Sequence, residues 1–133
     1  MRLAKILMIV VLVYVGIVAT FEALLGYFQP ADAQTMVITT FDDEGQGADR
    51  VVARLESNGT LYVAANHWPR AWFNDALEND AVDITFDGAT LPYRAVLLEG
   101  ADHDEVNARH ALPLTFRILT GFPPRYLMRL DPR

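Results

Sequence analysis

The order of hydrophobic and polar positions divides the chain into one long apolar run and a longer stretch of short alternating segments. Residues 6–28 are almost wholly apolar, with Glu22 as their single charge. As a helix, this run would rise roughly 34 Å at about 1.5 Å per residue, which is enough to cross the ~30 Å hydrocarbon core of a bilayer. We therefore expect one N-terminal transmembrane helix, with Glu22 near its outer end and in reach of water.

The charges that flank the apolar run predict its orientation. Arg2 and Lys5 precede it, whereas the first basic residue after it is Arg50 and the nearer charges are acidic. The positive-inside rule then places the N-terminus in the cytoplasm and the rest of the chain on the non-cytoplasmic side, periplasmic or extracellular. We expect residues 1–33 to form a membrane anchor and linker, and residues 34–133 to form one folded domain.

A cleaved signal peptide is the competing interpretation of the same run. Ala31-Asp32-Ala33 has the small-x-small form of a processing site. Against cleavage, the apolar run is long for a signal core, and Ala33 lies well beyond its most hydrophobic part. Under both interpretations, the domain is exported.

Beyond the linker, the pattern is typical of β-structure. Six segments carry strand-forming or alternating residues: 35–41, 50–56, 61–65, 81–87, 90–98 and 125–130. Asn58-Gly59 and Asp87-Gly88 lie between paired segments, and both favour type I′ hairpin turns, which need positive φ at both central positions. The segments therefore predict antiparallel hairpins.

Three short helices are expected between these strands. One occupies the 66–80 stretch and begins at Pro69, because proline suits the first helical turn. A second begins at Asp102, which forms a capping-box-like start with Glu105, and a third covers 114–119 and ends at Gly121. The predicted fold class is mainly β, with short helices: a six-stranded antiparallel barrel with helices on its rim.

Composition excludes several kinds of chemistry. The formal net charge is −6, and without Arg2, Lys5 and Glu22 the remainder carries −7, which repels nucleic-acid backbones. The chain contains no cysteine, so thiolate catalysis and zinc–thiolate sites are excluded. The histidines show no metal-ligand spacing, and His103 and His110 are expected to be solvated. No metal, hydrolase or phosphate-loop motif is found.

The helix start in the 66–80 stretch is the candidate site. Asn66, His67 and Trp68 precede the helix, where backbone N–H groups without intrahelical partners can face a ligand. Trp72 follows one turn later and adds an aromatic surface that suits a flat conjugated ring. The alternative is a packing helix that only closes the barrel.

Three segments resemble a known family: 37–40 (VITT), 61–66 (LYVAAN) and 69–80 (PRAWFNDALEND). The chain from about residue 36 to residue 131 resembles the deazaflavin-dependent nitroreductase/quinone reductase family. Trp72 stands at the tryptophan of the family's Pro-x-Trp-Tyr helix, and Phe73 stands at its tyrosine. The resemblance implies a split β-barrel like that of flavin reductases, a flavin or deazaflavin cofactor, and an oxidoreductase activity.

The resemblance also selects the residues that would contact the cofactor. No catalytic residue is identified in this way. The implied cofactor-binding residues are Thr39, Thr40, Arg50, Asn66, His67, Trp68, Arg70 and Trp72.

The chain departs from the family at the phosphate-binding loop. Where the family has a Gly-Arg-Lys-Ser-Gly-like loop, residues 41–47 read FDDEGQG, and three carboxylates there would repel a phosphate. The glycine-rich loop after the third strand is shortened to Asn66-His67-Trp68. Arg50 and Arg70 are the remaining bases that could replace the missing ones.

Three functions follow from these patterns. The first is a membrane-anchored oxidoreductase-like split barrel that binds a flavin, deazaflavin or quinone-like ring. The second is a non-catalytic exported binding or interaction module that has lost the phosphate site. The third is a heme- or lipid-handling barrel, which rests only on His67 beside the tryptophans. The sequence excludes nucleic acid as a partner and is compatible with a homodimer.

Overall fold

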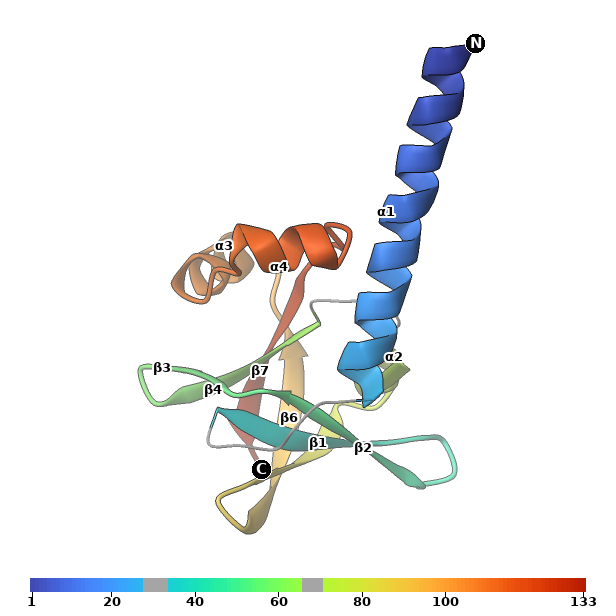
Figure 1. Cartoon of the computed structure of the whole chain (residues 1–133). Coiled ribbons are helices and arrows are strands. Elements are labelled where there is room, and N and C mark those ends of the chain that lie inside the picture. Colours follow the sequence, from blue (N-terminus) through green and yellow to red (C-terminus); the bar gives the residue numbers. More distant parts are fainter. Residues whose placement is uncertain (28–33, 66–70) are drawn as a thin grey trace.

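The computed structural model describes residues 1–27, 34–65 and 71–133. In these ranges the chain forms a curled antiparallel sheet with short helices around it and one long N-terminal helix (Figure 1). The helices are α1 (Arg2–Tyr27), α2 (Ala71–Glu78), α3 (Gly100–Arg109) and α4 (Leu114–Leu119). The strands are β1 (Thr35–Phe41), β2 (Gly47–Ala53), β3 (Leu55–Ser57), β4 (Thr60–Ala65), β5 (Ala81–Phe86), β6 (Ala89–Leu97) and β7 (Tyr126–Pro132).

The sheet has seven strands in the order β2-β1-β5-β6-β7-β4-β3. The predicted six are wrong in number, because the segment expected at 50–56 is divided at Arg54. Up to Ala53 it pairs with β1, and from Leu55 it pairs with β4. Since β2 and β3 follow each other in the chain but occupy opposite edges of the sheet, the curled sheet closes through Arg54 as a split barrel. The predicted mainly-β fold class is confirmed.

Both predicted hairpin turns are present. Asn58 and Gly59 have φ values of 54° and 75°, and Asp87 and Gly88 have values of 51° and 77°. These positive φ values at both central positions are those that a type I′ turn requires. The local sequence therefore determines the β3–β4 and β5–β6 connections.

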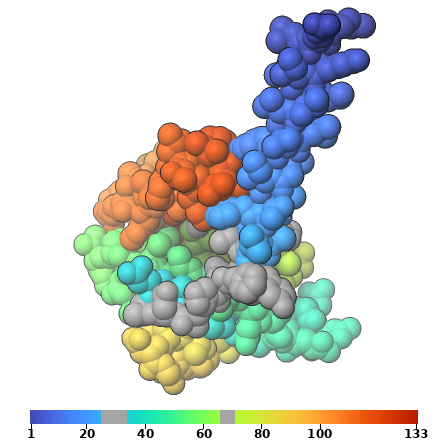
Figure 2. Space-filling view, in the orientation of Figure 1, coloured from blue at the N-terminus to red at the C-terminus, as the bar shows by residue number. Residues whose placement is uncertain are grey.

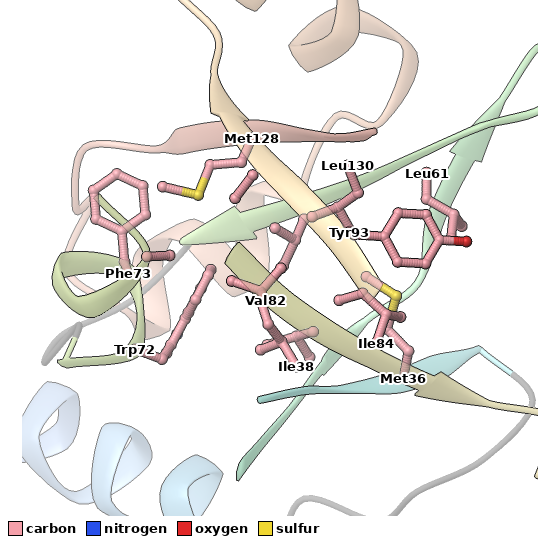
Figure 3. Packing of buried hydrophobic residues seen from close by; sticks show 14 of the residues in the cluster. Met36, Ile38, Leu61, Trp72, Phe73, Val82, Ile84, Tyr93, Met128 and Leu130 are labelled. Carbon is pink, nitrogen blue, oxygen red and sulfur yellow. The ribbon is translucent and has the colours of Figure 1, made fainter. Parts of the chain in front are cut away.

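Alternating side chains build the core inside the barrel. On β1, the residues at even positions, Met36, Ile38 and Thr40, are buried, and the residues between them are half-buried. Ile38 meets Val82 and other aliphatic side chains from the facing strands (Figure 3). Trp72 of α2 extends from the barrel rim into the same cluster (Figure 3).

The helix after β6 begins earlier than predicted. α3 starts at Gly100 with Glu99 as its N-cap, and no side chain makes a capping hydrogen bond there. The expected capping-box start at Asp102 is therefore wrong. Asp102 lies in the first turn instead, where its carboxylate interacts favourably with the positive end of the helix dipole.

The long helix α1 has two parts with different surroundings. From Arg2 to Leu24 it is long and apolar enough to cross a membrane, a test that a signal sequence also passes. Its N-terminal half extends away from the barrel, and its C-terminal half lies against the domain (Figures 1 and 2).

Three contacts hold α1 against α4 and the turn that follows it. The Tyr14 hydroxyl donates a hydrogen bond to the Ile118 carbonyl at 2.9 Å, and the Phe21 and Phe116 rings meet edge to face at 5.9 Å. Gly121 has a φ of 74°, and a Cβ there would lie 3.1 Å from a Val18 methyl group. Glycine at this position therefore permits the close approach of α1 to the turn that follows α4.

Candidate functional site

A cavity of about 560 Å³ lies where α1, the β1–β2 hairpin and α2 meet. Three elements far apart in the sequence therefore form its walls. Among the described residues, those that line it are Ala19, Glu22, Ala23, Thr40, Ala48, Asp49, Arg50, Ala71, Trp72 and Asp75.

Thr40 and Arg50 are polar residues in the wall of this cavity. Strand alternation places Thr40 on the inner face of β1, where it is 1% exposed, and Arg50 lies opposite Ile38 on β2. The Thr40 Oγ1 and the Arg50 Nε are both buried and have no hydrogen-bond partner among the described residues. Leaving a buried polar group unpaired costs about 1–3 kcal/mol. Two such atoms in one cavity are typical of a site that receives polar groups from a ligand.

Trp72 belongs both to the core and to the cavity wall. Its side chain is 7% exposed, and its ring meets the Phe73 ring edge to face at 5.9 Å. The Phe73 ring in turn stacks on the Tyr126 ring, with 5.2 Å between the ring centres. Trp72 and Phe73 therefore anchor α2 to the barrel. An indole that is held in this way gives the cavity a rigid aromatic wall.

The predicted site residues are only partly brought together. Thr40, Arg50 and Trp72 line the cavity. Thr39 does not, and its hydroxyl donates to the Asp49 carboxylate at 2.6 Å. The remaining predicted residues lie outside the described residues: Asn66, His67, Trp68 and Arg70.

Glu22 and its neighbours on α1 are the contribution that the sequence did not predict. Both carboxylate oxygens of Glu22 are buried in the cavity wall, so the expectation that this carboxylate reaches water is wrong. The physical reason is the docking of α1 against the domain, because it turns Ala19, Glu22 and Ala23 toward β2 and α2. A carboxylate inside a long apolar run is the signal that could have indicated a buried functional position.

The acidic loop between β1 and β2 uses its own carboxylate to hold its shape. The Asp42 Oδ1 accepts hydrogen bonds from the backbone N–H groups of Glu44 at 2.9 Å and Gln46 at 2.8 Å. The Asp42 N–H donates to the Gln46 carbonyl at 3.1 Å. These amides are therefore bound within the loop and are not presented to a phosphate.

The histidines of α3 and the turn after it are structural rather than solvated, so the expectation for them is wrong. His103 is half-buried, and its Nε2 donates to the Arg125 carbonyl at 2.9 Å. His110 has a buried Nε2, and its ring lies 6.5 Å from the Tyr62 ring. Arg125 donates to the Asn107 side chain and to the His110 carbonyl at 2.8 and 2.7 Å, and burial lowers the pKa of Arg125. Across residues 1–27, 34–65 and 71–133, no three acidic or histidine side chains form a metal-binding group.

Known structures share this fold. No family model matches the sequence, and no curated protein matches it significantly. An F420-H2 dependent reductase (FDR-A) is 19% identical, with a TM-score of 0.60 over 78% of this chain and 99% of its own. A protein described as a domain-swapped dimer is 20% identical, with a TM-score of 0.63 over 85% and 95%. HutZ, the heme storage protein from Vibrio cholerae, is 18% identical, with a TM-score of 0.57 over 77% and 83%.

These likenesses confirm the resemblance at the level of the fold. The chain has a split-barrel fold like that of the F420-H2 dependent reductase and of HutZ. Because identities this low are compatible with many activities on one fold, the site residues must carry the functional argument.

Proposed function

We propose that this chain is a membrane-anchored split-barrel oxidoreductase of the nitroreductase/quinone reductase type, which binds a flavin or deazaflavin ring in the cavity between α1, β1–β2 and α2. The observation that carries the proposal is the pair of buried, unpartnered polar atoms, Thr40 Oγ1 and Arg50 Nε, beside the Trp72 indole. A flat ring with polar edges would satisfy both atoms and would pack against the aromatic wall.

The residues of the cavity have separable roles in this proposal. Thr40 can donate or accept a hydrogen bond, and Arg50 can only donate, so together they would orient the polar edge of the ring. Trp72 would fix the plane of the ring, and the alanines of α1 and α2 would leave room for it. A bound flavin or deazaflavin supplies hydride transfer, and the protein contributes binding, orientation and the exclusion of water.

A second candidate is a non-catalytic binding module that has the barrel but not the phosphate site. The hydrogen bonds of Asp42 to its own loop favour it, since they occupy amides that could otherwise bind a phosphate. An absorption spectrum of the full chain, purified in detergent, separates the candidates. We expect a flavin-like band, or its appearance when riboflavin is added and excess is removed. A protein that retains no chromophore would favour the binding module, and a Soret band would favour heme.

Thr40→Val tests whether the unpartnered hydroxyl serves a ligand. Valine keeps the shape of threonine and removes a buried unpaired group, so we expect the ligand-free protein to gain about 1 kcal/mol of stability. The same substitution should weaken riboflavin binding. The melting temperature in detergent and a fluorescence titration measure the two effects.

Thr120→Val is the matched control for this substitution. Thr120 is as buried as Thr40, but its hydroxyl donates to the Phe116 carbonyl at 2.9 Å, so the control should lose stability and leave riboflavin binding unchanged. If Thr40→Val destabilised the protein as much as Thr120→Val, the Thr40 hydroxyl would have a structural partner and the proposal would lose its main support.

The proposed anchor places the domain outside the cytoplasm. Arg2 and Lys5 lie at the start of α1, before its apolar run, and no basic residue follows until Arg50, so we expect the C-terminus on the non-cytoplasmic side. Fusions of alkaline phosphatase and of a cytoplasm-active reporter after Arg133 test this orientation. Activity of the cytoplasmic reporter alone would reverse the orientation.

A homodimer is also part of the proposal, and the structural likeness to a domain-swapped dimer supports it. Cross-linking of the detergent-purified chain at several concentrations tests it. A single species with the mass of one chain at every concentration would contradict it.

A further inference from the structure

The exposed face of α4 and the turn that follows it is apolar. Leu114, Ile118 and Phe122 recur every four residues and are 62%, 43% and 51% exposed. We call these three residues the α4 stripe. Arg117 is the only charged residue between positions 111 and 124. A contiguous apolar face of this kind indicates a contact with another apolar surface.

The contacts of α1 indicate which surface this is. Tyr14, Val18 and Phe21 hold α1 against α4 and the turn after it, so of the apolar run that begins at Ile6 only the eight residues 6–13 extend freely beyond this contact. Eight helical residues rise about 12 Å, whereas the hydrocarbon core of a bilayer is about 30 Å thick. If α1 crosses the bilayer, the hydrocarbon must therefore extend past Tyr14 to the level of α4.

The exposed side chains of α1 at the level of α4 are consistent with a hydrocarbon layer that extends this far. Val15 and Ile17 lie within the segment that contacts α4, yet both side chains are more than 45% exposed. The side of α1 that faces away from α4 is therefore still apolar at this level, as expected for a helix surrounded by lipid. α4 lies crosswise to α1 in Figure 1 and would run along the membrane plane.

We infer that the α4 stripe inserts into the bilayer beside α1, so that the domain binds the membrane through an interfacial helix as well as through its anchor. This inference rests on the proposed membrane anchor. The guanidinium carbon of Arg117 lies 5.5 Å from the centre of the Phe122 ring, and its long side chain can extend to the headgroups while its stem stays in the apolar layer. The chain's net charge of −6 disfavours attraction to anionic headgroups, so the contact depends on apolar burial.

Single nitroxide labels test this inference, because the chain has no cysteine of its own. The full chain carries Ile118→Cys or Phe122→Cys, is labelled, and is reconstituted into phosphatidylcholine vesicles. Val10→Cys lies on the half of α1 that extends away from the barrel, and its label shows whether α1 lies in the bilayer. Leu91→Cys is the matched aqueous control, since Leu91 is 47% exposed, close to Ile118, but belongs to the β5–β6 hairpin at the opposite end of the molecule (Figure 1).

The rate at which the label collides with oxygen, which concentrates in the bilayer, is compared with the rate at which it collides with a water-soluble nickel complex. The measured quantity is the ratio of these two rates. We expect the oxygen-to-nickel ratio at positions 118 and 122 to exceed that at 91 several-fold and to approach the ratio at position 10. A ratio at 118 and 122 equal to that at 91, with position 10 in lipid, would overturn the inference and leave the anchor intact.

An oxygen-to-nickel ratio at position 10 as low as that at position 91 would overturn the anchor and the inference together. Spin–spin broadening at position 118 that disappears on dilution with unlabelled protein would identify a second copy of this chain as the occupant of the stripe, and would also overturn the inference.

Discussion

Replacing Trp72 by alanine is expected to lower the free energy of unfolding by about 3–5 kcal/mol, the cost of removing a buried aromatic side chain from a packed core. The indole is 7% exposed, joins the main core cluster and meets the Phe73 ring at 5.9 Å. Because α2 is only eight residues long, too short to be stable alone, its position depends on these contacts. Thermal unfolding in detergent measures the effect.

Two controls separate packing from ligand binding. Leu77→Ala changes an exposed side chain on the same helix and should alter stability by less than about 0.5 kcal/mol. Trp72→Phe keeps an aromatic wall and should retain most of the stability. If Trp72→Ala melted at the wild-type temperature, the indole would contribute nothing to the core, and its role would be confined to the cavity.

The connections of the barrel could be predicted because their causes are local. Asn58-Gly59 and Asp87-Gly88 adopt the positive φ values that their residue types favour, whatever the rest of the chain does. The division of one predicted strand into β2 and β3 has a different origin. The chain changes its pairing partner at Arg54, and its alternating pattern is the same whether one partner or two are present.

The cavity could be predicted only in part, because it depends on a contact over a long sequence separation. Thr40, Arg50 and Trp72 were selected by resemblance, and strand alternation explains why Thr40 faces inward. The wall that α1 provides could not be predicted. A helix that is apolar on all sides shows no preferred face, so nothing in its pattern indicates that Tyr14 bonds to the Ile118 carbonyl or that Glu22 faces the cavity.

Two features of the acidic loop disfavour the binding of a phosphate. From the sequence, three carboxylates were expected to repel a phosphate by their charge. The structure adds that the Asp42 carboxylate binds the amides of Glu44 and Gln46, so these two N–H groups are not free to bind a phosphate.

The phosphorylated deazaflavin coenzyme is therefore expected to bind weakly or not at all. Charge-assisted hydrogen bonds contribute about 1.5–3 kcal/mol each. The loss of two of them would weaken binding by roughly 10²–10⁴-fold, since about 1.4 kcal/mol corresponds to tenfold. Calorimetric titration of the full chain in detergent, with the coenzyme and with its phosphate-free ring analogue, measures this difference.

The double substitution Asp43→Lys with Glu44→Lys tests the role of the loop's charge from the opposite direction, because it restores two bases. Both side chains lie in an exposed loop that Asp42 holds in shape, so the variant should fold as the wild type does. Restoring two bases should raise the affinity for the phosphorylated coenzyme at least tenfold and leave the affinity for the phosphate-free ring unchanged. A wild-type dissociation constant in the micromolar range or below for the coenzyme would mean that the loop does not face the phosphate. Arg50, whose Nε is buried without a partner among the described residues, would then be the base to substitute next.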